Sequence, residues 1–423
     1  MRDSIKNHAI ATAALGTLLA LGACAPEAEK LAGERVSVFN RAANEGAAAS
    51  RAITLEKPRL AILWSGDSGN SANNTGHVQG RQNMEPLFSA DFARAPDKSF
   101  VLYPPAADES ALYAVDGNID IAKISLADGK KQWVQTGLSS DASLKFGALA
   151  LDDDALYAAA SNMEIAKIGK ESGRILWRRK LKGTLKSGLQ ACGGKIVLSN
   201  DAGEVFAVSA EDGQKIWSHK TLESPFGFIK GSTPACAGDK VIAALGNGEV
   251  HILSLADGSP LHMAGMFRGA PTSINSISDI VANPVAADGV VLVKSYSGGT
   301  KAISLASGEE LWSRAWSGPA TPAASNGFVF DVDGDGIARA FDLASGAEVW
   351  SLKPDLGKGA VYSPLLINNR LVIAGASGAG AVIDPYEGRI LERVNFGMRI
   401  DAPPMMAGEK LVISGAAGLR AWR

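Results

Sequence analysis

The chain has 423 residues, of which 42 are lysine or arginine and 44 are aspartate or glutamate, so its formal net charge is −2. Nucleic-acid-binding proteins carry a basic patch or stripe, and this near-neutral chain has no long run of like charge, which argues against that class. Its densest basic stretch, 178–186, is explained by a solvated strand end.

The first 23 residues have the pattern of a secretory signal. Arg2 and Lys6 precede an apolar run, 9–21, that is too short for a stable membrane span. Leu-Gly-Ala then precedes Cys24, which resembles the lipobox of bacterial lipoproteins. The resemblance implies cleavage before Cys24 and attachment of lipid to its sulfur and its new amino group, and two or more chains hold a protein stably on a membrane. An ordinary signal peptide with a chance cysteine is the alternative.

We therefore predict three parts: a lipoprotein signal peptide (1–23), a lipidated cysteine with a flexible tether (24–57), and one folded domain (58–423). The tether is rich in alanine and glutamate and shows no sustained apolar period. Alanine, not aspartate, follows the cysteine, and in lipoprotein families aspartate there favours retention in the inner membrane. The predicted location is the periplasmic side of the outer membrane.

A repeat of the form [Asp/Ser]-Gly-x-x-x-Trp dominates the rest of the chain. Its turn glycines lie 44, 40, 45, 50, 38 and 42 residues apart, and a period in the low forties is typical of β-propeller blades. The seven glycines are Gly129, Gly173, Gly213, Gly258, Gly308, Gly346 and Gly388. Two copies have lost the tryptophan, with His262 and Glu392 in its place. A tryptophan that recurs once per repeat indicates packing against the neighbouring blade more than stacking on a cofactor.

Each unit reads as four short strands with the proline-containing run innermost and the tryptophan run outermost. The second strands are predicted at 111–115, 155–160, 195–200, 240–245, 290–295, 328–333, 370–375 and 410–415. This predicts an all-β, eight-bladed propeller. The eighth unit shows no outer strand after 418–423, and we predict that 59–65, with Trp64, docks there and closes the ring. A seven-bladed ring with irregular ends is the alternative.

Cys192 and Cys236 both end an inner strand, one blade apart. An exported protein permits a disulfide between them, but neighbouring blades could also hold the two residues beyond disulfide reach, which leaves a disulfide and two buried thiols both open.

No catalytic constellation, phosphate loop or metal-ligand spacing stands out, so we expect no enzyme activity, cofactor or metal. The segment Asp331–Asp335 has the alternating aspartates of a calcium loop. It also coincides with a hairpin turn, which favours aspartate and glycine in any case, and we prefer the turn interpretation.

The segments 124–133 and 341–350 resemble the repeat of the pyrroloquinoline-quinone (PQQ) type of propeller, and the resemblance covers about 59–423. Two kinds of protein share this repeat. Quinoprotein dehydrogenases, which depend on PQQ and calcium, are longer and carry an adjacent cysteine pair that this chain lacks. The BamB type, lipoproteins of the outer-membrane β-barrel assembly (BAM) machinery, has a lipobox, a short tether and an eight-bladed ring without a cofactor.

Resemblance to the BamB type implies a scaffold that binds a POTRA domain of the barrel-forming subunit BamA, acts with other BAM subunits and aids unfolded outer-membrane clients. In that family the loops before two consecutive inner strands make the contact. Here those loops precede Pro234 and Pro284, and the implied partner-binding residues are Phe226, Phe228, Lys230 and Asp279. Local loop packing is the alternative for the two phenylalanines. The alternative functions are a quinoprotein dehydrogenase and an envelope lipoprotein with another protein partner.

Overall fold

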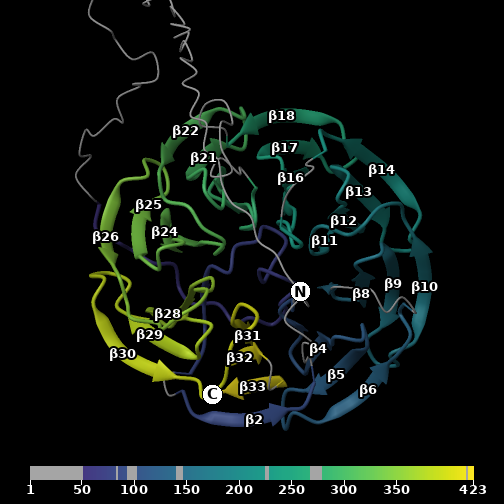
Figure 1. Ribbon diagram of the computed structural model, residues 1–423, viewed down its shortest axis with the longest axis horizontal. Helices are drawn as coiled ribbons and strands as arrows, with labels where there is room; N and C mark the ends of the chain where they lie inside the picture. The colour runs from purple at the N-terminus through teal and green to yellow at the C-terminus, as the bar shows by residue number, and fades with distance from the viewer. Residues whose placement is uncertain are drawn as a thin grey trace, which may run out of the picture. The chain divides into compact units, whose positions relative to one another are not determined.

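The computed structural model describes residues 51–81, 84–92, 102–139, 146–223, 228–266, 279–415 and 418–423. Within these ranges the chain forms eight sheets arranged as blades around one axis (Figure 1). The eight-bladed propeller predicted from the repeat is confirmed. Cys24 and the predicted signal peptide lie outside the described residues.

The strands of the blades run outward from the axis in chain order. Blades 1 to 4 consist of β3 (Ala106–Ala107), β4 (Ala111–Val115), β5 (Ile121–Ser125) and β6 (Lys131–Gln135); β7 (Gly147–Leu151), β8 (Ala155–Ala160), β9 (Glu164–Gly169) and β10 (Ile175–Lys180); β11 (Gln190–Cys192), β12 (Lys195–Ser199), β13 (Glu204–Ser209) and β14 (Lys215–Lys220); and β15 (Ala235–Ala237), β16 (Lys240–Ala244), β17 (Glu249–Ser254) and β18 (Pro260–Gly265).

Blades 5 to 7 consist of β19 (Val285–Ala287), β20 (Val290–Lys294), β21 (Thr300–Ser304) and β22 (Glu310–Arg314); β23 (Ala323–Ser325), β24 (Phe328–Val332), β25 (Ala338–Asp342) and β26 (Glu348–Leu352); and β27 (Leu365–Ile367), β28 (Arg370–Ala374), β29 (Ala379–Ile383) and β30 (Ile390–Asn395). Blade 8 takes β31 (Met405–Ala407), β32 (Lys410–Gly415) and β33 (Gly418–Trp422) from the C-terminal part of the chain. The predicted second strands match β4, β8, β12, β16, β20, β24, β28 and β32 to within one residue.

An N-terminal strand closes the ring, as predicted, but it is not the predicted segment. β2 (Pro86–Ala90) pairs antiparallel with β33, and Figure 1 shows the two side by side, purple against yellow. Trp64 instead bridges Ala107 of β3, where it is 3% exposed. The repeat needs an aromatic ring on the outer strand of blade 8, and Phe88 of β2 supplies it.

That aromatic ring is part of a contact that recurs between neighbouring blades. The ring on the outer strand lies over the turn glycine of the next blade, so closely that a Cβ on Gly258 would sit 2.5 Å from the Trp217 ring. The Trp217 indole N–H also donates to the Leu255 carbonyl at 3.1 Å. The same ring-on-glycine pairs are Trp133 on Gly173, Trp177 on Gly213, His262 on Gly308, Trp312 on Gly346, Trp350 on Gly388 and Phe88 on Gly129. The tryptophans therefore pack one blade against the next. His262 has the same packing role, and its Nε2 lies 2.9 Å from the Ala306 carbonyl oxygen.

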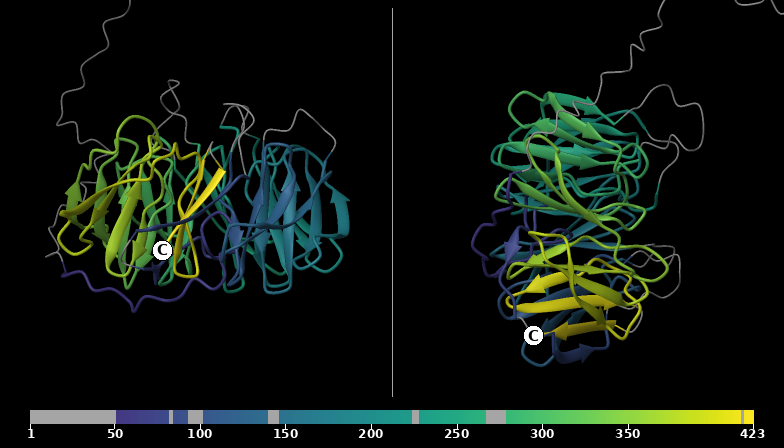
Figure 2. Two further views of the ribbon diagram at one scale, coloured as in Figure 1. Left: turned by 90° about the horizontal axis from the view of Figure 1, so that it is seen from below. Right: turned by 90° about the vertical axis from the view of Figure 1, so that its left-hand side faces the viewer.

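The loops into the inner strands emerge on one face of the ring, which we call the loop face, and the first turn of each blade lies on the opposite turn face. Residues 51–57 run along the turn face, visible as the purple trace below the ring in Figure 2 (left). Ile53 is buried there against Phe328, Arg51 lies over the Phe328 ring at 4.4 Å, and Thr54 accepts a hydrogen bond from Asn326.

The following residues, 59–80, lie at the ring axis, and we call them the axial segment. Their backbone and side chains bond to the inner part of successive blades: Trp64 to Ala107, Ser65 to Leu151, Ser71 to Cys236, Ala72 to Ala286, Asn74 to Ala324 and Val78 to Asn368. β1 (His77–Val78) then pairs parallel with β27, and Gln79 returns to bond with Arg59. The axial segment thus makes one circuit inside the ring.

Candidate functional site

The structure describes three of the four predicted partner-binding residues: Phe228 and Lys230 in the loop before β15, and Asp279 in the loop before β19. Phe226 lies outside the described residues. The three described residues do not form one surface, because Phe228 faces outward, Asp279 lies beneath it and Lys230 turns toward the axis.

Phe228 is held from two sides. Its N–H donates to Asp279 Oδ2 at 2.7 Å, and its carbonyl accepts a hydrogen bond from Lys186 Nζ. Its ring packs against Tyr296, with 4.6 Å between the ring centroids. Phe228 is nevertheless 38% exposed and Tyr296 45% exposed, so the pair presents aromatic surface on the loop face. Lys186 of blade 3 and Asp279 of blade 5 thus set the position of Phe228.

Asp279 is fully buried, which a partner-contacting aspartate would not be in the free protein. Burial raises the pKa of its carboxyl group, while the hydrogen bond from the Phe228 N–H and the charge of Lys186 act in the opposite direction. The geometry makes Asp279 a positioning residue for Phe228. The family resemblance implied that Asp279 contacts the partner, and its burial could not be predicted because burial of a loop residue leaves no periodic signal.

Lys230 lies at the edge of the axis, where its ammonium contacts Asp67 of the axial segment at 3.0 Å and the Tyr103 ring at 4.1 Å. Asp67 also accepts hydrogen bonds from Thr233 and Asn283, both at 3.0 Å. Asp67, Lys230 and Asn283 line a cavity of about 200 Å³ whose remaining lining is largely apolar. The charges at this point of the axis neutralise each other.

Sequence reasoning missed Lys186, Tyr296 and the exposed apolar neighbours Leu222 and Ile229, which are 72% and 50% exposed. Tyr296 occupies the hairpin turn between β20 and β21, where a glycine-rich sequence, Ser-Gly-Gly, follows it. Such a turn normally carries small polar residues, and an aromatic residue there is the one signal that could have identified it.

Two aspartates of the calcium-like segment, Asp331 and Asp333, pair with cations of the protein. Asp331 forms a buried ion pair with Lys294, and Asp333 pairs with Arg339 and accepts the N–H groups of Asp335 and Ile337. These bonds are those of a hairpin turn stabilised by two cations. Across the residues that the structure describes, no group of three or more histidine, cysteine or acidic side chains is arranged to hold a metal ion.

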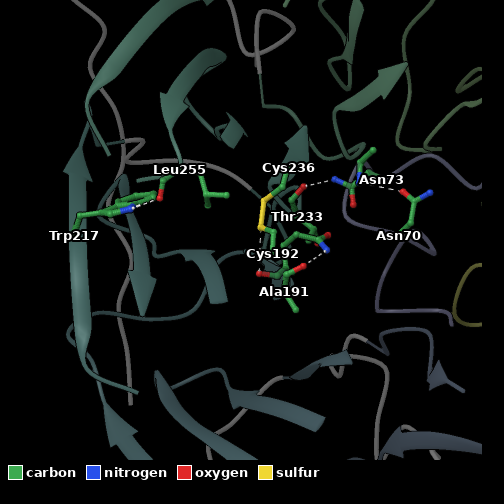
Figure 3. The surroundings of a disulfide bond; sticks show 10 residues. Asn70, Asn73, Ala191, Cys192, Trp217, Thr233, Cys236 and Leu255 are labelled. Atoms are coloured by element: carbon green, nitrogen blue, oxygen red, sulfur yellow. Dashed lines mark hydrogen bonds between the residues drawn. A yellow bond between two sulfur atoms is a disulfide. The ribbon is translucent and has the colours of Figure 1, made fainter. Parts of the chain in front are cut away.

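Cys192 and Cys236 form a disulfide, which settles the alternative that the sequence left open (Figure 3). Their Cα atoms are 6.4 Å apart, and the bond joins the inner strands β11 and β15 of blades 3 and 4. Figure 3 also shows Asn73 of the axial segment bonded to Thr233 on the same side. The two blades beneath the Phe228 loop are thus linked covalently.

In the described ranges, no helix has the length and apolar character to cross a membrane.

The outer membrane protein assembly factor BamB of Yersinia pestis is 25% identical over 249 residues, which are 58% of this chain and 62% of that protein. The chain therefore aligns with somewhat less than two thirds of this relative's length.

Among solved structures, BamB from Moraxella catarrhalis superposes with a TM-score of 0.69 at 16% identity, covering 81% of this chain and all of that one. Quinohemoprotein alcohol dehydrogenase from Comamonas testosteroni has a TM-score of 0.64 at 11% identity, covering 85% of this chain and 80% of that one. At these identities the superpositions show a shared fold and nothing finer.

The family model described as outer membrane protein assembly factor BamB matches residues 117–352, more than half of the chain and the core of the propeller. The chain therefore belongs to the BamB family.

Proposed function

We propose that this protein is a non-enzymatic scaffold of the outer-membrane β-barrel assembly complex, held at the periplasmic face of the outer membrane by lipid on Cys24. It binds a POTRA domain of BamA, acts beside the other BAM subunits, and helps unfolded barrel proteins to assemble and insert. Membership of the BamB family supports the complex, and the lipobox-like sequence before Cys24 supports the anchor.

The observation that carries the proposed contact is the clamped aromatic pair on the loop face. Phe228 and Tyr296 are exposed although Lys186 and Asp279 fix the Phe228 backbone. A rigid exposed aromatic group loses little conformational entropy on binding, which is why aromatic residues dominate interface hot spots. Ile229 extends the apolar surface beside it.

The non-enzymatic part of the proposal is supported by the axis. Among the charged groups that line the axial cavity, Asp67 pairs with Lys230 and accepts hydrogen bonds from Thr233 and Asn283, and Asp401 pairs with Arg399. A quinone-dependent dehydrogenase needs free charged groups there for calcium and cofactor. Titration with PQQ and Ca²⁺ should give neither a saturable absorbance change nor dye reduction; saturable binding with turnover would replace the scaffold proposal by the dehydrogenase alternative.

The contact is tested by measuring the affinity of the purified protein for the POTRA domains of BamA from the same organism. Phe228→Glu should weaken binding about 30-fold or more, the effect of losing a hot spot of roughly 2 kcal/mol. The matched control is Tyr386→Glu, which alters an aromatic residue of similar exposure, 42%, on the turn face of blade 7. Equal affinities of the Phe228→Glu variant and the control would refute the site.

Asp279 offers a second variant pair. Asp279→Asn keeps an oxygen that accepts the Phe228 N–H, whereas Asp279→Ala leaves that N–H without its partner. We expect Asp279→Asn to bind BamA like the unchanged protein and Asp279→Ala to bind more weakly, with both folded by circular dichroism. Weak binding by both variants would instead mean that the Asp279 charge contacts the partner.

The anchor is tested by mass spectrometry of the N-terminal peptide and by membrane fractionation. We expect acylated Cys24 as the first residue and recovery in the outer-membrane fraction, and Cys24→Ser should release the protein from the membrane. An unmodified N-terminus elsewhere in the chain would exclude the lipoprotein assignment.

A further inference from the structure

Two histidines face each other across the junction of blades 3 and 4. His219 lies on β14, two residues after Trp217, so that both side chains point at blade 4. His251 lies on β17, on the same face of the strand as Leu253, which packs against the apolar residues of blade 3. The pair therefore continues the interface that Trp217 begins, toward the loop face.

The hydrogen bonds fix which ring nitrogens face each other. His251 Nε2 is 3.0 Å from Glu249 Oε2, and because a carboxylate only accepts hydrogen bonds, Nε2 carries the proton. In neutral His251 the other nitrogen, Nδ1, then has a free lone pair. His219 Nε2 lies 3.2 Å from this nitrogen.

A separation of 3.2 Å is close to the distance between two imidazole nitrogens on one tetrahedral ion. With metal–nitrogen bonds of roughly 2.0–2.1 Å, two ligands at the tetrahedral angle lie about 3.3–3.4 Å apart. A carboxylate that holds the far nitrogen of a ligating histidine is the usual outer partner in such sites, because it fixes the ring and makes the ligand more basic. Glu249 has this position.

The histidine pair is buried on the His251 side and reaches solvent on the His219 side. The His251 and Glu249 side chains are 8% and 13% exposed, whereas His219 is only partly buried. Met263 lies opposite His251 on β18 and is 67% exposed.

The pair is particular to this junction. At the equivalent register positions, the junction of blades 1 and 2 has Gln135 and Ala166, and the junction of blades 6 and 7 has Leu352 and Ala381. The general packing of the repeat therefore does not require nitrogen ligands here.

We propose that His219 Nε2 and His251 Nδ1 form a binding site for a divalent transition-metal ion, with Glu249 orienting His251 and water completing the coordination. Imidazole ligands suit Zn²⁺ and Cu²⁺, with Cu²⁺ the tighter of the two. The described residues supply only these two nitrogens, so the site is open and exchangeable. A bound ion would link blades 3 and 4 just before residues 221–223 lead toward the Phe228 loop.

Calorimetric titration of the purified full chain with Zn²⁺ tests the proposal, and Zn²⁺ avoids oxidation of cysteine. We expect one site that is lost in both His219→Ala and His251→Ala and weakened about 10–100-fold in Glu249→Gln. The matched control is His262→Ala, which removes a histidine of the neighbouring outer strand and should leave the site intact. With Cu²⁺, the electron paramagnetic resonance spectrum should show coupling to two nitrogens in the unchanged protein only.

The competing possibility is a plain hydrogen bond in which His219 Nε2–H donates to His251 Nδ1. In that case Zn²⁺ binding is absent, or is the same in the His219→Ala and His251→Ala variants as in the unchanged protein, and either result overturns the proposal. Thermal unfolding without Zn²⁺ checks that the variants fold. Repeated with Zn²⁺, it should show stabilisation only of a chain that keeps both histidines.

Discussion

The contact between an outer-strand ring and the next turn glycine can be tested within one blade. Gly258 and Gly238 are both turn glycines of blade 4 with positive φ, 74° and 61°. A Cβ on Gly258 would meet the Trp217 ring at 2.5 Å, whereas a Cβ on Gly238 would meet nothing within 4 Å. Alanine at either position therefore imposes the same backbone strain, but only alanine at Gly258 also displaces the ring.

The left-handed backbone costs a residue with a Cβ about 1–2 kcal/mol. Forcing a methyl group into a packed contact adds about 1–3 kcal/mol. We expect Gly238→Ala to lower the free energy of unfolding by the first amount only, and Gly258→Ala by about 2–5 kcal/mol in total. The difference between the two variants measures the packing of Trp217 on the glycine.

Guanidinium unfolding followed by far-ultraviolet circular dichroism gives the two free energies, and Trp217→Ala supplies the test of cause. In a Trp217→Ala background the ring is gone, so Gly258→Ala and Gly238→Ala should cost the same. Equal costs in the unchanged protein, or an excess cost at Gly258 that survives removal of Trp217, would refute the reasoning.

Two further predictions concern covalent and ionic links between blades. Replacing both Cys192 and Cys236 with serine should lower the free energy of unfolding by up to about 4 kcal/mol, from the 44-residue separation that the disulfide closes; a reductant should destabilise the unchanged protein similarly and leave the double variant unaffected. Lys294→Met should cost about 3–5 kcal/mol at pH 7, because it leaves the buried Asp331 carboxylate without its cation. Burial raises the pKa of Asp331 above its unfolded value, so on acidification the folded variant takes up a proton before the unfolded variant does. The stability lost by Lys294→Met should therefore shrink as pH falls through that raised pKa. Unfolding curves at pH 7 and pH 4.5 measure this change.

Repetition explains which parts of the fold the sequence predicts. The turn glycines and the strand pattern recur, so the blades, their second strands and the packing role of the tryptophans follow from the sequence alone. The closing strand occurs once. The tryptophan pattern of the other units favoured Trp64, whereas the ring that covers Gly129 is Phe88. A substitution of one aromatic residue for another in a single unit carries no periodic signal.

The candidate site was predicted less completely because it lies in loops that differ between blades. The resemblance to the BamB family, by residue type and position in the loops, led to the prediction that Phe228 and Asp279 contact the partner. The burial of Asp279 under Phe228 depends on a contact between two loops 51 positions apart, and the turn of Lys230 toward Asp67 depends on an axial segment 163 positions earlier in the chain. Such long-range contacts cannot be inferred from a local pattern.

The circuit of the axial segment has a consequence for the order in which the protein is built. Its residues from Trp64 to Val78 meet blades 1, 2, 4, 5, 6 and 7 in the same order in which those blades are synthesised. Each new blade can therefore dock onto the next free residues of a strip that already exists, so the strip acts as an internal template. The last steps, pairing of Gly408 with Ala61 and of β33 with β2, join segments that are synthesised after blade 7 to segments that are synthesised before blade 1. Until then, β2 stays an unpaired strand.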